Sequence, residues 1–274
     1  MPLDGLPCSG RLDTPLGAPT GPFELPLLPG SPLLAIGAVD FATIRDYAAH
    51  VTGSLPHNPV LQDAHAFARA LLERWGWKDL ENAWDQNTEG CLWALMDMDL
   101  QQHLPIPEAA MILRHAQPVQ GQHPFMPLIQ DKAPLPYEWS GQPGVLAPML
   151  TERLSLCLAR HGHHWLAASR EPIMAHLADS PDDANPIHAD LYLRADWAKM
   201  AHCAETLLAR AAAWELIPRR NADDVQSAWL PPLRTLGRLG MLEIQFHVKD
   251  NHTRFHGHLA RSARTTAPTE AQSP

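Results

Sequence analysis

The sequence predicts an α+β fold in which antiparallel sheets built from hairpins carry helices on one face. Short apolar runs bounded by Pro or Gly have the length and pattern of strands. Segments with helical periodicity follow two of these runs, and each is introduced by an Asp that can cap a helix. Hydrophobic residues make up 45% and charged residues 19% of the 274 residues, an ordinary globular composition. We therefore expect a folded chain with a substantial core.

The first predicted unit covers residues 31–116 and begins with the apolar run Leu33–Gly37, which has the length of a buried strand. Asp40 follows this run and can accept hydrogen bonds from the free N–H groups in the first turn of a helix. Helical spacing of apolar residues then predicts a helix pair, and two further apolar runs predict a hairpin. The elements expected after Asp40 are helices over about 41–51 and 58–75 and strands at 91–96 and 109–113.

The same order of elements returns near the C-terminus, within a second predicted unit that covers residues 144–261. Asp196 precedes a helix as Asp40 does, and Pro231 and Pro232 are expected to break or kink the next helix. The expected elements are a hairpin at 154–159 and 165–168, a short helix opened by Glu171-Pro172, a strand at 189–194, helices over about 197–216 and 222–236, and a hairpin of 241–248 and 253–259 that turns at Asp250-Asn251. Because the order recurs in 31–116 and 189–260, we predict two related strand–helix–helix–hairpin units.

Three segments outside these elements are rich in Pro, Gly or polar residues. Residues 1–30 are predicted to be a Pro-rich extended lead-in, residues 117–143 a Pro/Gly-rich connection, and residues 262–274 a disordered tail. The lead-in lacks the features of a signal peptide, and we predict no transmembrane segment. The expected location is cytoplasmic if Met1 is the natural start, and periplasmic or envelope-associated if an export signal has been lost.

Several stretches of the sequence carry a resemblance to a known class of proteins. They are Leu33–Val51, Trp165–Leu177 with the sequence WLAASREPIMAHL, Ala189–Met200 and the closing hairpin. In these stretches the sequence resembles uncharacterised bacterial proteins with a domain of unknown function. Those proteins are attached to or exported across the inner membrane and contain repeated strand–helix–hairpin modules. The resemblance implies an envelope setting and brings no activity, cofactor or active site with it.

Charge and cysteine usage narrow the classes of partner and site. The formal net charge is −9, so we do not expect binding to nucleic acid through phosphate neutralisation. The four cysteines form no CxxC pair. They are Cys8, Cys91, Cys157 and Cys203. The simpler interpretation is four free thiols, three of them acting as small hydrophobic residues inside strands or helices, and the alternative is one disulfide in an exported chain.

A metal site is the first chemical hypothesis, because the chain has 16 histidines. In the predicted closing hairpin, the alternation of a strand places His247, His256 and His258 on the polar face together with Glu243. Zinc held by these side chains is one interpretation. Arg254 faces His247 in the predicted register and would oppose a cation. The alternative is a solvated or partner-binding sheet face.

Two other clusters have a chemical and a simpler interpretation. They are His161, His163 and His164, and the tryptophans Trp75, Trp77, Trp84 and Trp93. The three histidines fall in a predicted hairpin turn, where their rings diverge and no carboxylate is adjacent, so a polar turn is simpler than a metal site. Tryptophans can line a ligand pocket, but the large apolar area of each ring favours the core.

No established catalytic motif occurs in the sequence. There is no nucleophile elbow, no HExxH and no phosphate-binding loop, so we expect no catalytic residue and no cofactor other than the zinc considered above. The first hypothesis is a non-catalytic binding or structural module that meets a protein partner or a second copy through the sheet face of His247 and His256 or the hairpin edges. The alternatives are a metal-binding protein or metal-dependent hydrolase using the C-terminal histidines, and a small-ligand carrier with an aromatic pocket.

Overall fold

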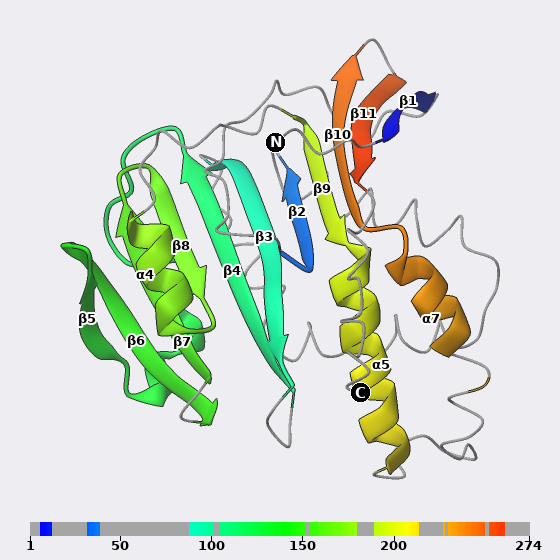
Figure 1. The fold of residues 1–274 in the computed structure, drawn as a ribbon. Coiled ribbons are helices and arrows are strands. Elements are labelled where there is room, and N and C mark those ends of the chain that lie inside the picture. Colours follow the sequence, from blue (N-terminus) through cyan, green and yellow to red (C-terminus); the bar gives the residue numbers. More distant parts are fainter. Residues whose placement is uncertain are drawn as a thin grey trace, which may run out of the picture.

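One continuous antiparallel sheet organises the computed structural model of this chain (Figure 1). The structure describes residues 6–12, 32–38, 88–100, 105–151, 154–179, 189–213, 227, 230–249 and 252–260. From one edge of the sheet to the other, the 11 strands are β1 (Leu6–Leu12), β11 (His252–Ala260), β10 (Met241–Lys249), β9 (Leu191–Asp196), β2 (Leu34–Ala38), β3 (Thr88–Asp99), β4 (Ile106–His115), β8 (His164–Ala168), β7 (Leu154–His161), β6 (Gln142–Thr151) and β5 (Leu135–Trp139).

Strands β2 and β9 join what the sequence predicts as separate sheets. They pair antiparallel, with Ala35 opposite Arg194 and Ile36 opposite Leu193. Each is a short strand in the interior of the sheet, so its backbone groups need partners along both edges. The described residues therefore form a mostly-β structure with a single sheet and a few helices packed against it. This corrects the prediction of several sheets, while the antiparallel hairpins are confirmed.

Helix α4 (Glu171–Asp179) lies over β7 and β8 on one face of the sheet. It begins at Glu171-Pro172 as predicted, because a proline in the first turn sacrifices no helical hydrogen bond. Met174 and Leu177 are buried, and they pack in one core cluster with Leu166 and other small and apolar residues of the strands. Burial of this stripe holds the helix to the sheet.

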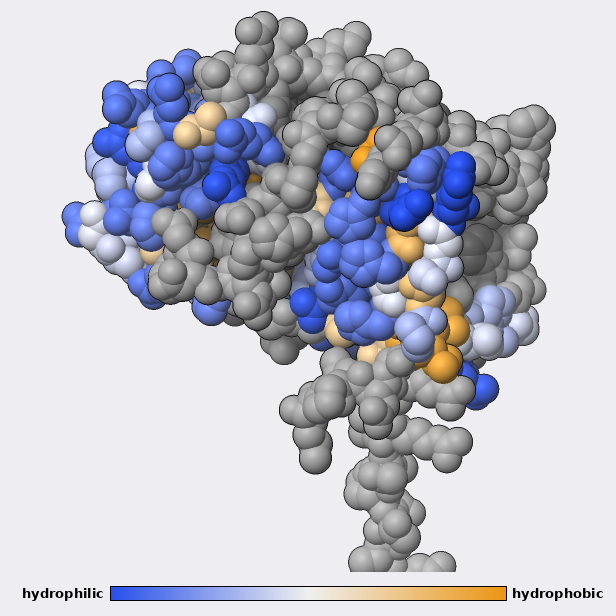
Figure 2. All heavy atoms as spheres, turned by 90° about the horizontal axis from the view of Figure 1, so that it is seen from above, coloured by the Kyte–Doolittle hydropathy of each residue, from blue (hydrophilic) through white to orange (hydrophobic). Residues whose placement is uncertain are grey.

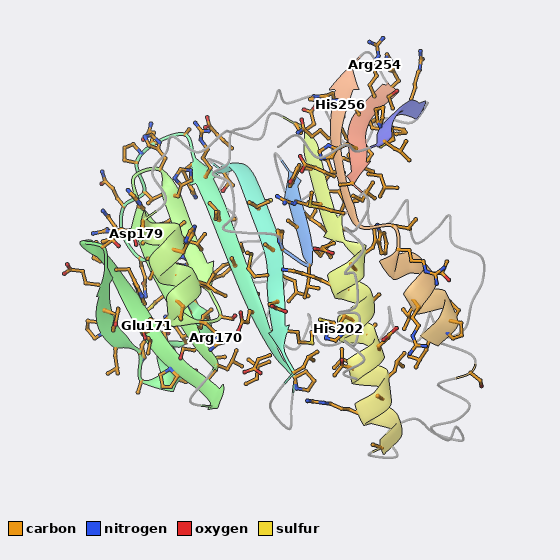
Figure 3. All side chains as sticks on the ribbon, in the orientation of Figure 1. Arg170, Glu171, Asp179, His202, Arg254 and His256 are labelled. Atoms are coloured by element: carbon orange, nitrogen blue, oxygen red, sulfur yellow. The ribbon has the colours of Figure 1, made fainter. Side chains whose placement is uncertain are left out.

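Both ends of α4 are tied to the neighbouring hairpin through Glu171 and Asp179, which are labelled in Figure 3. The Tyr137 hydroxyl of β5 donates a hydrogen bond to Glu171, and the Ser140 hydroxyl after β5 donates one to Asp179. The Glu171 carboxylate raises the pKa of Tyr137 through this bond. The β5–β6 hairpin is therefore held to the first and last residues of the helix.

The opposite face of the sheet is covered by the segment between β4 and β5. This segment contains two short 3-10 turns, Met126–Leu128 and Gln130–Lys132. Phe125 and Ile129 are buried there against Leu158 and Trp165 of the sheet. Most of the predicted Pro/Gly-rich connection is therefore a packed covering, and its end forms β5 and the start of β6. The sequence pattern does not predict β5 and β6 because both contain prolines. Pro is unfavourable in the interior of a sheet and is tolerated near its edge.

Helix α5 (Trp197–Ala213) begins as the sequence predicts. The Lys199 N–H donates a 3.0 Å hydrogen bond to the Asp196 carboxylate, which caps the first turn. Helix α7 (Leu230–Gly237) packs against α5. Pro231 and Pro232 lie in its first turn. The first N–H groups of a helix have no intrahelical partner, so a proline there loses no helical hydrogen bond. Of the predicted helix over 222–236, only residue 227 and the part from Leu230 onward are described, so whether the two prolines interrupt a longer helix stays a prediction.

The predicted register of the closing hairpin is confirmed. Phe246 lies opposite Phe255, and the apolar residues of β10 alternate with polar ones, as a strand with one core face requires. The hairpin is extended by β1, which comes from the predicted extended lead-in and pairs with the outer edge of β11. Gly10 of β1 packs closely there, because a Cβ atom at this position would come within 2.4 Å of the Phe255 ring and the ring would have to shift.

Several predictions lie outside the described residues. They concern the helices over 41–51 and 58–75 with the Asp40 cap, the tryptophans Trp75, Trp77 and Trp84, the turn Asp250-Asn251, and the tail 262–274. Within the part that the structure describes, no helix is long and apolar enough to cross a membrane. Figure 2 shows the molecule from above, where most of the described surface residues are hydrophilic and the apolar ones gather in small groups.

Candidate functional site

A polar strip runs over the outer strands β10, β11 and β1. We define the basic strip as Ser9, Arg11, His247, Arg254, His256 and His258. Strand pairing places Arg254 directly opposite both His247 and Arg11, and His256 opposite Ser9. Arg11, Arg254 and His256 are exposed, and Figure 3 shows Arg254 and His256 at the outer end of the sheet. The strip is therefore a part of the sheet that keeps one polar face accessible.

His247 and His256 form a stacked pair within this strip. Their ring centroids lie 5.0 Å apart and their planes differ by 3°. Burial lowers the pKa of His247, the neighbouring His256 lowers it further, and the negative charge of Asp190 raises it. The net lowering keeps the His247 imidazole neutral near pH 7, since an ordinary imidazole already titrates near 6.5. The His247 side chain therefore carries no charge, and the permanent positive charge next to the pair belongs to Arg254.

The three predicted metal ligands are brought to the same face but not to one point. His258 lies opposite Glu243, at the other end of the strip from His247. The rings of His247 and His256 lie in nearly parallel planes. The lone pair of each ring nitrogen lies in the plane of its own ring, so the two lone pairs do not point at one ion. Among the described residues, no three His, Cys, Asp or Glu side chains come together to hold a metal. Zinc binding through these histidines stays a prediction that requires the rings to rotate.

Asp190 is a buried carboxylate that the sequence does not single out. Its backbone N–H donates to the Phe246 carbonyl at 2.9 Å, and its Oδ2 accepts from the Val248 N–H at 2.8 Å. Its exposed fraction is 6%, and its Oδ1 has no hydrogen-bond partner among the described residues. Asp190 thus fixes the end of β10 beside β9 and places one negative charge behind His247.

The position of Arg254 is set by a neighbour on its own strand. Its Nε donates a 3.2 Å hydrogen bond to Nε2 of His252, which is buried. In this contact Nε2 of His252 is the acceptor. The contact leaves the two outer nitrogens of the Arg254 guanidinium for an acceptor at the surface, because a guanidinium carries five donors.

The histidine-rich turn between β7 and β8 has a structural role. His161 and His164 pair across the hairpin, and Gly162 adopts a positive φ of 56°. The His163 carbonyl accepts from the His115 N–H at 2.9 Å, which docks the turn against β4. The polar-turn interpretation fits this geometry, since the turn residues are engaged with the backbone and neighbouring strands.

A pocket of about 240 Å³ lies where the segment over the sheet meets β6 and β7. His123 lines it and is almost fully buried, with Nε2 donating to the Leu166 carbonyl at 3.1 Å and Nδ1 accepting from the Phe125 N–H. Burial lowers the pKa of His123 to about 3. Both ring nitrogens are thus occupied and the ring is neutral. The sequence signal for His123 is weak, because it lies in a Pro-rich stretch without periodicity.

All four cysteines lie within the described residues as free thiols, and Cys91, Cys157 and Cys203 are buried. This matches the interpretation of small hydrophobic residues.

Compared with known proteins, the chain has no match among protein-family models, characterised proteins or solved structures. The function must therefore be inferred from the geometry of this chain alone.

Proposed function

We propose that this chain is a non-catalytic binding module whose basic strip receives an acidic segment of a partner protein. The observation that carries the proposal is the pairing of Arg11 with Arg254 on adjacent strands. The outer N–H groups of the Arg254 guanidinium can bind a carboxylate of the partner, and Arg11 adds a second positive charge at the facing position. An acidic protein of net charge −9 with two facing arginines at one edge thus offers a localised site for an anionic partner.

The neighbouring residues suit this role. Ser9 and His256 lie opposite each other beside the arginine pair and add side chains that donate hydrogen bonds. The contact between Arg254 and His252 orients the guanidinium without neutralising it. Binding would depend on charge pairs at an exposed surface, so we expect moderate affinity and a marked dependence on salt.

A labelled peptide rich in Glu and Asp tests the proposal by fluorescence anisotropy, with the Gln and Asn version of the peptide as the ligand control. We expect Arg254→Gln to weaken binding of the acidic peptide about tenfold, equivalent to about 1.4 kcal/mol. Arg254→Lys should retain part of the affinity, because it keeps the charge and loses the planar fork. Arg238→Gln, at an exposed site after α7, is the charge-matched control. Equal binding to wild type and Arg254→Gln, or no binding to wild type, would overturn the proposal.

The two-unit organisation is a further part of the proposal. Strands β2, β3 and β4 extend to one side of the β2–β9 pairing, and β9, β10 and β11 extend to the other in the same chain order. This arrangement supports an internal repeat whose two halves meet at their first strands. An experimental structure in which these two groups of three strands fail to superpose would contradict it. If the resemblance to exported bacterial proteins holds, the partner would lie in the envelope.

A further inference from the structure

The pocket beside His123 has a composition that suits a small ligand with an apolar body. Its walls include the apolar side chains of Met126, Val145, Leu158 and Trp165. A cavity of about 150 Å³ is known to accommodate benzene. The volume of about 240 Å³ therefore accommodates a single ring with one small substituent, or a branched chain of similar size.

The polar groups of the pocket point to the charge of this ligand. His123 is neutral and both of its nitrogens are engaged with backbone groups, so it offers neither charge nor a free donor. Arg160 also lines the pocket, and it is the charged residue of the lining. Within the described part of the chain, no carboxylate lies within ion-pair distance of Arg160.

Strand pairing brings the charge next to the aromatic wall. Arg160 of β7 lies directly opposite Trp165 of β8, so both side chains leave the same face of the sheet from adjacent positions. Trp165 is itself held in place, because His123 packs edge-on against it with ring centroids 5.0 Å apart. A cation beside a fixed aromatic wall is the arrangement that recognises a ring bearing an anionic group.

We propose that this pocket binds a small carboxylate with a single ring or a branched apolar chain. The apolar body packs against Trp165 and Val145, and the carboxylate pairs with Arg160. The site is separate from the basic strip and does not depend on the function proposed for that strip.

Benzoate is the test ligand, measured by ligand-observed NMR and calorimetry on the full chain, with benzyl alcohol and acetate as comparison ligands. We expect benzoate to bind at least fivefold more tightly than either, because benzyl alcohol lacks the charge and acetate lacks the ring. Arg160→Gln should weaken benzoate at least fivefold and leave benzyl alcohol unchanged. Arg160→Lys should retain part of the benzoate affinity, and Arg238→Gln should have no effect.

A second variant tests the location of the site. Val145→Phe places a ring in the pocket and should remove the binding of both benzoate and benzyl alcohol, while circular dichroism checks that the fold is retained. Absence of saturable benzoate binding up to about 10 mM, above the millimolar range expected for so small a ligand, would overturn the proposal. Benzoate binding that is unchanged in Arg160→Gln would also overturn it. Neither outcome bears on the acidic-peptide experiment, which reports on Arg254.

Discussion

The Asp190 carboxylate accepts a hydrogen bond from the Val248 N–H at 2.8 Å and closes the ladder between β9 and β10. The bond is buried, and it joins two residues 58 positions apart in the chain. Asp190 also provides the negative charge that raises the pKa of His247 against the effect of burial. One side chain thereby links the geometry of the hairpin to the protonation of the histidine pair.

Replacing Asp190 by Ala should destabilise the protein. The Val248 N–H would lose its acceptor in a buried environment, and an unsatisfied buried donor costs about 1–3 kcal/mol. Urea denaturation should therefore show a lower free energy of unfolding than for the exposed-site control Ser9→Ala. An unchanged midpoint for Asp190→Ala would contradict the structural role of this bond.

Replacing Asp190 by Asn separates its charge from its hydrogen bond. The amide oxygen can still accept from Val248, but the negative charge near His247 is gone. Because that charge raises the pKa of His247, we expect the pKa to fall in this variant. An NMR titration of the His247 ring measures it, and a pKa that stays constant or rises would show that Asp190 does not act on His247 electrostatically.

The buried ring of His123 predicts how stability depends on pH. Its pKa is about 3 in the folded chain and near 6.5 in the unfolded chain, so between these values the unfolded state binds more protons. Stability should therefore fall with decreasing pH, by up to about 1.4 kcal/mol per pH unit from this residue. His123→Asn should show a flatter profile from pH 7 to pH 4 in urea denaturation. His202→Asn, on the exposed side of α5, should keep the wild-type slope.

Gly257 should be intolerant of any side chain. A Cβ atom at this position would lie 2.1 Å from the Glu243 carbonyl oxygen on the paired strand, so the backbone of the hairpin would have to move. We expect Gly257→Ala to lower the free energy of unfolding by about 3 kcal/mol, at the upper end of ordinary overpacking costs. Denaturation measured by circular dichroism tests this, and a loss below that of Ser9→Ala would be inconsistent with the close approach.

Metal content distinguishes the zinc hypothesis from the binding module. Because the rings of His247 and His256 lie in parallel planes, we expect protein purified without a histidine tag to contain under about 0.1 equivalent of zinc, as genuine sites retain their metal tightly. Elemental analysis measures it. A stoichiometric content that is lost in His256→Ala but not in His202→Ala would instead establish the C-terminal metal site.

Local pattern in the sequence was sufficient for the elements that depend on neighbouring residues. The Asp196 cap, the start of α4 at Glu171-Pro172 and the register of β10 and β11 all follow from interactions over a few positions, and the structure has them as expected. The placement of His247 and His256 on one polar face follows from the same alternation, because side chains of a strand point to opposite faces in turn. The polar face of the candidate site could therefore be predicted.

Tertiary structure alone decided how these pieces join and what surrounds them. The pairing of β2 with β9 and the placement of β1 beside β11 connect residues more than 150 positions apart, and no local pattern encodes such contacts. The same is true of the Arg11–Arg254 pairing and the Asp190 hydrogen bond to Val248. Propensity acts along the chain, whereas burial and strand pairing act between distant segments, so the sheet and the charges that meet on it become visible only when the chain is folded.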